Sequence, residues 1–512
     1  MNGKLGIRWS LVLGMILGML HVTYAQQSEY VVLVGKSVHQ DMAWSKVIDK
    51  LEKVHQAVIV EYQVFPSEAL PRLKELFPRY VAIVEKPENV SLDFVVDINR
   101  MSREVDDDIY NDFLWGIITG YDADAALRLV ERAQCAKLVR SVWSIGGEDF
   151  GDGKYFEQMG RMSEDAGGWS WGEKENALDS LVFSKFEKEN SPELIEKMLN
   201  WAVRYNPDLV IYQTPDVGNR IWLARTFMQG ENGFLSPRKG KLWYGDRDVK
   251  LGDNSRVCVV PAFGGNTFGS RESVPVVWLD GGNVTALLGA VTISSGGRGE
   301  WGTLKYWMTD AERFTLAEAF FLNQQEMLYK LNQWNPELLK RVVYGNVKSS
   351  NVVIEYFEMC KTYRERMVDL TGSSWDSMNK FVYMYEKDIM VYYGDPAWGV
   401  RMKDLLKDSP YHVTSKMKRK KCVVTIKTSK NFTLERLGGE LRREKGDAFA
   451  KYFPVSDLPI CYFFPERLKD PRIHGKVKDD YEIEVNKDCL FIYNSVVLEP
   501  DKEYRIVIDV RR

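Results

Sequence analysis

The strongest constraint on the fold is the regular alternation of short apolar runs with amphipathic stretches between residues 30 and 85. The apolar runs are YVVLVG, AVIVEY and YVAIVE, and the amphipathic stretches DMAWSKVIDKLEKV and SEALPRLKELF separate them. Short runs rich in Val and Ile are typical of buried strands, and the stretches between them have the spacing of helices. Strand and helix in strict alternation predict a parallel α/β sheet.

A second α/β block follows a connection rich in Gly and Trp around DAGGWSWGEKE. Ser191 and Pro192 have the order of an N-cap and a first helical residue, and the helix is expected to run to about Tyr205. The runs LVIY, RVCVV and VTALLGAVTIS predict three further strands, and SGGRGEWGT reads as a flexible segment. Thr315 and Glu318 form a capping box at the start of a long helix.

The pattern changes beyond about Lys416. The runs KCVVTIKT, ICYFF, YEIEV, CLFIYN and YRIVIDV are short, partly alternating and separated by Pro, Asp and Lys. This pattern predicts a small immunoglobulin-like β-sandwich after the α/β body.

The N-terminus has the pattern of a signal peptide. Lys4 and Arg8 precede the apolar run from Trp9 to Leu20, and Thr23-Tyr24-Ala25 fits a signal-peptidase site. The expectation is a signal peptide over residues 1–25 and a protein that is exported to the periplasm, the cell surface or the medium. No later run reaches the roughly 18 residues that a membrane-spanning helix needs, so no transmembrane segment is expected.

Charge and cysteine spacing bound the partners. The 69 Lys and Arg residues against 72 Asp and Glu residues give a net charge of -3, which does not favour nucleic acid. The six cysteines are scattered and none has metal-ligand spacing, so no cofactor is expected. The acidic run from Asp106 to Asp108 leaves a Ca²⁺ loop open beside its ordinary interpretation as a solvated turn.

Two Gly-rich or Pro-rich loops follow neighbouring predicted strands. They are YQTPDVGN, which begins at Tyr212, and PAFGGNTFGS, which begins at Pro261. The carboxyl ends of parallel strands form the usual ligand crevice of an α/β sheet. The sequence therefore predicts a ligand site where these two loops meet.

Several segments carry a family resemblance. The segments DDDIYNDFLWGIITGYDADAALRLVERA, RFTLAEAFFLNQQ and YYGDPAW, in this order, resemble the gingipain-type, caspase-like cysteine peptidases and their exported bacterial relatives. The resemblance spans about Glu29 to Met402, and Gly394-Asp395-Pro396 is among its most specific parts. It implies a two-part caspase-like body, with an N-terminal α/β subdomain over 26–155 and a caspase-like subdomain over 156–410, before a β-sandwich over 411–512.

The resemblance implies a His on the first loop and a Cys on the second. A thiolate would attack the scissile carbonyl and the imidazole would manage the proton. The first loop has no His, Thr267 stands at the implied Cys position, and no His lies between Gln56 and Tyr411. Cys258, inside the run RVCVV, is expected to be a buried apolar residue. The implied loops are therefore vestigial, and their candidate residues are Thr214, Asp216, Asn219, Asn266 and Thr267.

These residues favour a pseudo-peptidase that binds peptide or protein segments. The candidate ligand-binding residues are Gly264, Gly265, Trp169, Trp171 and Trp301, the tryptophans being expected in exposed Gly-rich loops. One alternative is an active peptidase or other hydrolase that uses Thr267 as nucleophile with Asp216 as base. Another is a glycan-binding surface protein that uses the tryptophan loops.

Overall fold

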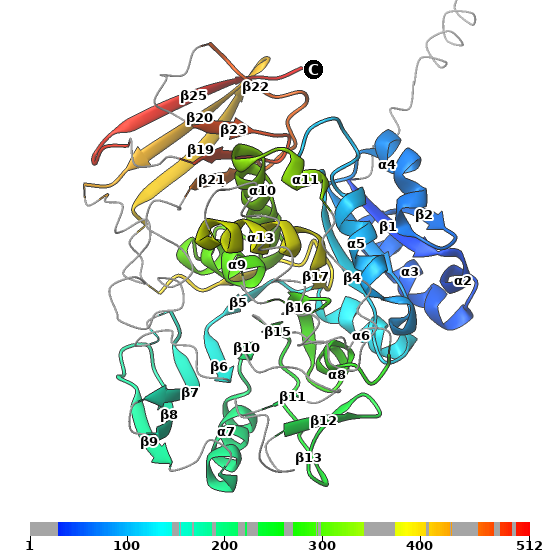
Figure 1. Ribbon diagram of the computed structural model, residues 1–512, viewed down its shortest axis with the longest axis vertical. Helices are drawn as coiled ribbons and strands as arrows, with labels where there is room; N and C mark the ends of the chain where they lie inside the picture. The colour runs from blue at the N-terminus through cyan, green and yellow to red at the C-terminus, as the bar shows by residue number, and fades with distance from the viewer. Residues whose placement is uncertain are drawn as a thin grey trace, which may run out of the picture.

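The computed structural model describes most of the chain (Figure 1). The described residues are 29–511 except 146–152, 154, 166–167, 187–190, 213–220, 223–233, 261–269, 293, 295–297, 342–373, 406–408, 431, 433–458, 476–481 and 494–497. Within these residues, no helix combines the length and the apolar character needed to cross a bilayer.

One sheet of twelve strands runs through the body, in the order β2-β1-β3-β4-β17-β16-β15-β10-β6-β7-β8-β9. The strands of its first part are β1 (Tyr30–Gly35), β2 (Val58–Tyr62), β3 (Tyr80–Val84), β4 (Leu114–Ile118) and β17 (Met390–Tyr393). Those of its second part are β16 (Val284–Ala290), β15 (Arg256–Val259), β10 (Leu209–Tyr212), β6 (Ser141–Ile145), β7 (Gln158–Asp165), β8 (Gly168–Lys174) and β9 (Val182–Phe186). The predicted mostly parallel α/β body is confirmed.

The sheet reverses direction between β17 and β16. The strands β1, β2, β3, β4 and β17 pair in parallel with one another. The strand β16 pairs antiparallel with β17, and β15, β10 and β6 then run parallel to β16. The carboxyl ends of β1–β4 and those of β6, β10, β15 and β16 therefore lie at opposite edges of the sheet. The strand β6 precedes residue 155 in sequence and pairs with β10 in the second part. The division of the body at residue 155 stays a prediction.

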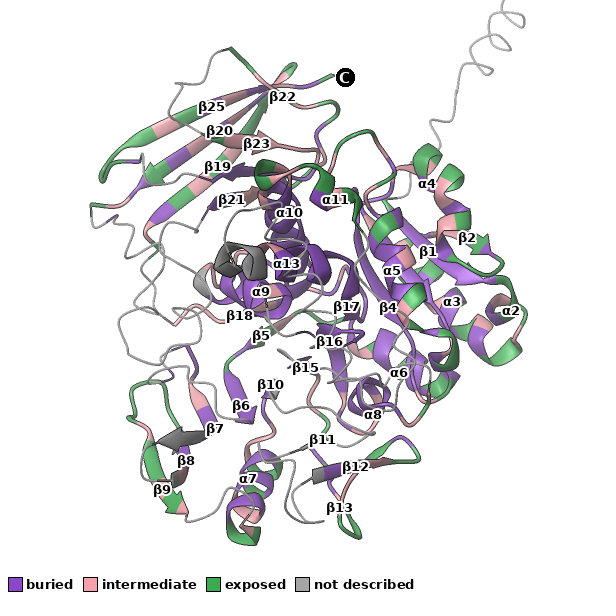
Figure 2. Ribbon diagram, viewed as in Figure 1, coloured by how far each residue is buried: buried purple, intermediate pink, exposed green. Residues whose placement is uncertain are grey.

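Helices cover the sheet, and their ends follow the capping signals of the sequence. They are α2 (Lys36–His39), α3 (Met42–His55), α4 (Leu70–Leu76), α5 (Leu92–Met101), α6 (Ala123–Arg132), α7 (Pro192–Tyr205), α8 (Val274–Asp280), α9 (Arg298–Thr309), α10 (Leu316–Trp334), α11 (Glu337–Lys340) and α13 (Ser374–Ile389). The Ser191 hydroxyl accepts from the Leu194 N–H, and Thr315 and Glu318 form the expected capping box. Figure 2 shows the buried residues along the central strands and the exposed ones on the outer helices and edges.

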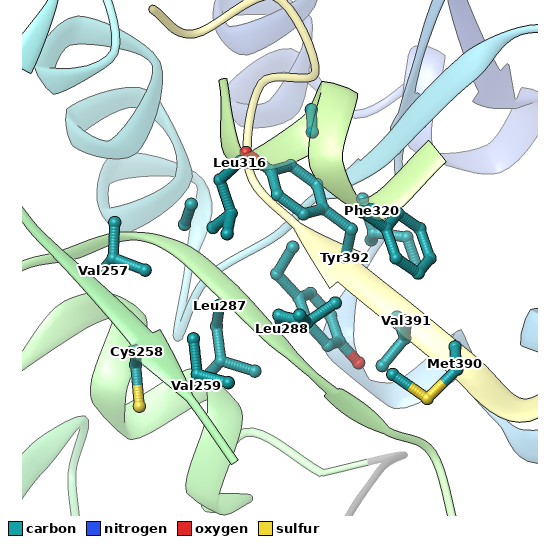
Figure 3. Close-up of a cluster of buried hydrophobic side chains, with 14 of the residues drawn as sticks. Val257, Cys258, Val259, Leu287, Leu288, Leu316, Phe320, Met390, Val391 and Tyr392 are labelled. Atoms are coloured by element: carbon teal, nitrogen blue, oxygen red, sulfur yellow. The ribbon is translucent and has the colours of Figure 1, made fainter. Parts of the chain in front are cut away.

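The core around β15, β16 and β17 joins the two parts of the sheet and packs against α10. Figure 3 shows side chains from these strands and from Leu316 and Phe320 gathered in one cluster. The Phe320 ring lies at 6.2 Å from the Tyr392 ring and stacks on it. Cys258 is fully buried in β15, and burial raises the pKa of its thiol well above the ordinary value. Its predicted role as a buried apolar residue is confirmed.

Two segments expected to be loops are regular elements. The residues GWSWGEK form β8, and RGEWGT begins α9. The glycines are there because neighbouring groups approach closely: a Cβ on Gly302 would lie 1.9 Å from Oδ1 of Asn323, and one on Gly172 would lie 2.6 Å from the Phe183 ring. Glycine in these segments allows tight packing, and the loop prediction is wrong.

Two small antiparallel sheets follow the body. One has the order β19 (Tyr411–Lys418), β20 (Lys421–Thr428), β25 (Glu503–Asp509) and β22 (Arg472–Ile473), and the other has β21 (Ile460–Phe463), β24 (Cys489–Ile492) and β23 (Ile483–Val485). The predicted short strands are thus present. The immunoglobulin-like classification stays a prediction.

The sheet β21-β24-β23 is apolar on both faces. Leu490 and Ile492 belong to a cluster that also holds Val424 and Ile506 of the other small sheet. Cys489 and Phe491, which alternate with them along β24, belong to the core of the body instead. Because successive side chains of a strand point to opposite faces, this sheet lies between the other small sheet and the body.

Two further small sheets are present. One pairs β5 (Lys137–Val139) with β18 (Val400–Met402), and the other contains β11 (Ile221–Trp222), β12 (Phe234–Arg238), β13 (Lys241–Tyr244) and β14 (Arg247–Asp248).

Candidate functional site

The strands before the two predicted loops are direct neighbours. Leu209 in β10 pairs with Val257 in β15, and Ile211 pairs with Val259, in parallel. The segments that follow these strands therefore begin at the same edge of the sheet, which is the arrangement that a strand-end crevice needs. The loop candidates themselves lie outside the described residues; they are Thr214, Asp216, Asn219, Gly264, Gly265, Asn266 and Thr267.

The three candidate tryptophans do not form an exposed aromatic surface. Trp301 is fully buried in α9 and Trp171 is fully buried in β8, where its ring lies 6.0 Å from that of Trp201. Trp169 is partly buried and packs against the same core. The expected exposure of Trp171 and Trp301 is wrong, because both side chains pack in the core of the body.

His39 lies far from the predicted crevice. It ends α2, the short helix that follows β1, at the edge of the sheet opposite to the carboxyl end of β15. In the sheet order β15 is five strands from β1, which corresponds to about 24 Å at the usual strand spacing. Its Nδ1 lies 2.5 Å from Oε1 of Glu61 on the edge strand β2. His39 is therefore held by a carboxylate in the first part of the sheet.

His55 is part of a cluster around Asp395. The imidazole lies at 4.0 Å from the Tyr30 ring and stacks on it, and its Nε2 lies 2.7 Å from Oδ2 of Asp395. The Tyr30 hydroxyl donates to Oδ1 of the same carboxylate at 2.8 Å, and the N–H of Ala397 donates to it at 2.9 Å. Asp395 thus ties the end of α3 and the start of β1 to the chain beyond β17. The motif Gly394-Asp395-Pro396 has a structural function here.

A group of carboxylates lies where the body meets the small sheets. One oxygen from each of Asp106, Asp108 and Asp112 lies within 4.8 Å of the other two, so these three residues can supply ligands to a cation. They line a cavity of about 440 Å³ whose other wall includes Lys487 and Arg467. Lys487 Nζ donates to Oδ2 of Asp106 at 2.7 Å. The cluster therefore combines carboxylate ligands with one cation that already neutralises part of their charge.

Burial changes the proton affinity of these carboxylates. Burial, and then the charges of Asp106 and Asp108, raise the pKa of Asp112 to about 8. Burial also raises the pKa of Asp108 to about 6. Burial opposes ionisation of Asp106 too, but hydrogen bonds led by that from Lys487 lower its pKa. The cluster therefore favours either a bound proton or a bound cation near neutral pH.

Arg467 holds the wall of this cavity together. Its guanidinium donates to the carbonyl oxygens of Phe77, Pro78 and Asp112 at 2.6, 2.9 and 2.7 Å. It also donates to Oδ2 of the buried Asp488 at 2.9 Å. The run Asp106 to Asp108 was expected from the sequence and Asp112 was not, although the spacing of the three acidic residues was a visible signal. No local signal pointed to Arg467, because its contacts are far apart in sequence.

No family model matches this chain, and no curated protein matches it. Gingipain R (RGPB), an Arg-specific cysteine proteinase, has 11% sequence identity, coverage of 91% of both chains and a TM-score of 0.40. The complex of the pro- and mature domains of Porphyromonas gingivalis RgpB has 11% identity, coverage of 91% of this chain and 93% of that chain, and a TM-score of 0.34. A structure described as a protease has 10% identity, coverage of 78% and 84%, and a TM-score of 0.35. Residue roles therefore rest on the geometry of this chain alone.

Proposed function

We propose that this chain is an exported protein with a gingipain-like scaffold, and that it binds peptide or protein segments where β10 and β15 end. In this proposal the crevice does not cleave its ligand by a Cys-His pair. The sequence supports export through its signal-peptide pattern over residues 1–25. Two parallel neighbouring strands that end at one edge support a ligand site there.

One observation carries the non-catalytic part of the proposal. No His lies between Gln56 and Tyr411, and His39 and His55 make their hydrogen bonds with Glu61 and Asp395. Cys258, on the strand that leads into the second loop, is buried with a raised thiol pKa. A buried thiol with a raised pKa gives little thiolate, which is the species that attacks a carbonyl.

The contacts of Asp395 support a scaffold kept for its shape. The residues that carry the family resemblance at this point make a structural cluster with Tyr30 and His55. A chain can keep such a cluster after its catalytic pair is lost, because the cluster stabilises the body.

The test combines a thiol-reactive probe with a peptide library. We expect labelling of the native protein at the exposed Cys135 and none at Cys258, mapped by mass spectrometry, with the unfolded protein as the positive control. We also expect the library to remain uncut. Cleavage that is abolished by Thr267→Ala and weakened by Asp216→Asn would contradict the proposal and favour the alternative hydrolase. Retention of library peptides by the wild type would identify the ligand class.

A further inference from the structure

A second cavity of about 400 Å³ lies among helices that belong to neither the strand-end crevice nor the acidic cluster. Its walls come from the end of α5, from α10 and α11, and from the end of α13. Figure 1 shows α10, α11 and α13 grouped in the middle of the molecule, and α5 packs against α13. The cavity is therefore built from regular, packed elements.

Cations outnumber carboxylates in this wall. Its cationic residues are Arg100, Arg103, Lys340 and Lys387, and its acidic residues are Glu104 and Asp388. Two of the cations share the buried carboxylate: Arg103 donates to Oδ1 of Asp388 at 2.5 Å, and Lys387 Nζ donates to Oδ2. Even when Glu337, which pairs with Lys340, is counted with the two carboxylates of the wall, one cation remains in excess.

The Arg100 guanidinium carries most of that free charge. It is exposed and makes no ion pair or side-chain hydrogen bond within the described part of the chain. Among the described residues, Lys340 pairs with Glu337 at 3.0 Å on the exposed helix α11, where such a pair is weak. An incoming anion can therefore pair with Arg100 without first breaking a buried contact.

The neighbouring positive charges also affect the pKa of Lys387. Burial lowers the pKa of Lys387 to about 8, Asp388 opposes this effect, and the charges of Arg103 and Arg100 add to it. A negative charge in the cavity would reduce this repulsion.

The remaining wall is apolar. Ile109, Leu328, Pro336 and Leu339 line it, and the Asn332 amide is the uncharged polar group among them. Such a wall suits an aliphatic or aromatic group, and the amide suits a neighbouring carbonyl or N–H.

We propose that this cavity binds a carboxylate that carries an apolar group, with the carboxylate on Arg100 and the apolar group against Leu328 and Leu339. Two sources share this chemistry: the free C-terminus of a peptide that ends in an apolar residue, and a small free carboxylic acid. The planar guanidinium favours carboxylates because it can donate two parallel hydrogen bonds. This site is separate from the strand-end crevice, so it does not depend on the function proposed for that crevice.

Isothermal titration calorimetry on the full chain tests the proposal with three probes: acetyl-Ala-Ala-Leu with a free carboxylate, its C-terminal amide, and 4-methylpentanoate. We expect at least one of the two carboxylates, the peptide acid or 4-methylpentanoate, to bind at least about tenfold more tightly than the peptide amide. Loss of a charge-assisted hydrogen bond predicts a difference of this size. Tighter binding of the peptide acid assigns the peptide source, and tighter binding of 4-methylpentanoate assigns the free acid.

Variants locate the binding. Arg100→Gln should weaken the preferred probe at least about tenfold, and Leu339→Asp, which places a like charge in the wall, should weaken it as well. The matched control is Arg72→Gln, an exposed arginine on α4 that pairs with Glu75, and it should leave affinity unchanged. Equal affinity for acid and amide, no binding of any probe, or unchanged affinity in Arg100→Gln would overturn the proposal.

Discussion

The acidic cavity, around Asp106 and Asp112, and the basic cavity, around Arg100 and Lys387, both take residues from one segment, the connection from α5 to β4. The acidic cavity takes Asp106, Asp108 and Asp112 from this segment, and the basic cavity takes Arg103 and Ile109. The first lies against the small sheets and the second among helices of the body. Twelve residues of chain thus supply two sites of opposite charge.

The difference between the cavities lies in which charge is in excess. In the acidic cavity, burial and mutual repulsion raise the pKa values of two carboxylic acids. In the basic cavity, burial and repulsion lower the pKa of Lys387. Burial penalises the charged form in both cavities, and neighbouring like charges add to that effect: those of Asp106 and Asp108 around Asp112, and those of Arg103 and Arg100 around Lys387.

The largest expected effect is that of Arg467→Met in the acidic wall. The substitution removes the guanidinium that donates to three backbone carbonyl oxygens. Among the described residues it leaves the buried Asp488 carboxylate with the more distant Arg79, at 3.6 Å, as its ion-pair partner. Removing one partner of a buried pair costs about 3–5 kcal/mol. Urea denaturation should show that loss in the free energy of unfolding.

The matched control for Arg467→Met is Arg505→Met, which removes an exposed arginine from its pair with Glu503. This change should stay within about 0.5 kcal/mol of the wild type. A similar small loss in Arg467→Met would mean that the acidic wall does not depend on this guanidinium.

Lys387→Met should change how stability depends on pH in the basic cavity. The folded pKa of Lys387 is about 8, below the ordinary value of 10.5. As pH falls from 10.5 to 8, the unfolded chain takes up a proton that the folded chain does not, so this residue makes the wild type less stable. Relative to the variant, the wild type should gain about 3 kcal/mol between pH 8 and pH 10.5. Denaturation curves at both pH values measure this change, and Lys340→Met is the exposed control. Parallel stability curves for the wild type and Lys387→Met would contradict the prediction.

Local signals in the sequence predicted most of the elements and few of the contacts. The N-cap Ser191 and the capping box of Thr315 and Glu318 were read correctly, because caps depend on residues three apart. The runs around Trp171 and Trp301 were predicted wrongly as loops. The sequence alone does not distinguish a glycine that permits a turn from a glycine that permits close packing. Only the partner, such as Asn323 against Gly302, distinguishes them.

Local patterns in the sequence also predicted only part of the candidate sites. The parallel pairing of β10 with β15 follows from their apolar runs, whereas the seven candidate loop positions lie outside the described residues and stay predictions. The run Asp106 to Asp108 was visible, but Lys487 and Arg467 reach it across more than 350 residues of sequence. Such long-range contacts have no periodic pattern, so a single sequence does not reveal them.

Asp112→Asn should stabilise the protein at alkaline pH and leave it unchanged at acidic pH. The folded pKa of Asp112 is about 8, above its ordinary value of 3.8. Between these values the folded chain holds a proton that the unfolded chain has lost, so wild-type stability falls as pH rises. The amide of the variant cannot ionise, so the substitution removes this loss of stability. We take the loss as on the order of 2 kcal/mol because the three carboxylates share it.

Thermal denaturation of Asp112→Asn at pH 4 and pH 8 measures the effect. Asp107→Asn is the control, because Asp107 is exposed on the same turn and lies outside the group of three. A variant that is less stable than the wild type at pH 8 would show that ionised Asp112 contributes contacts that outweigh its burial.

The smallest expected effect is that of Ca²⁺ on the acidic cavity. Binding at Asp106, Asp108 and Asp112 would stabilise the folded chain by mass action, by about 1 kcal/mol at millimolar Ca²⁺. The gain is small because Lys487 already neutralises part of the charge and would be displaced from Asp106 or repelled. The gain should be larger at pH 8 than at pH 6, since the cation competes with protons on Asp108 and Asp112.

Asp108→Asn separates a specific site from general charge screening. This variant should lose the gain from Ca²⁺, whereas Asp107→Asn should keep it, and Na⁺ at equal ionic strength should give neither variant a gain. If Ca²⁺ raised the melting temperature equally in both variants, the ion would be acting on the whole surface. The carboxylates of the acidic cavity would then be neutralised by protons and not by a cation. The two cavities would differ in that one holds protons and the other binds an anion.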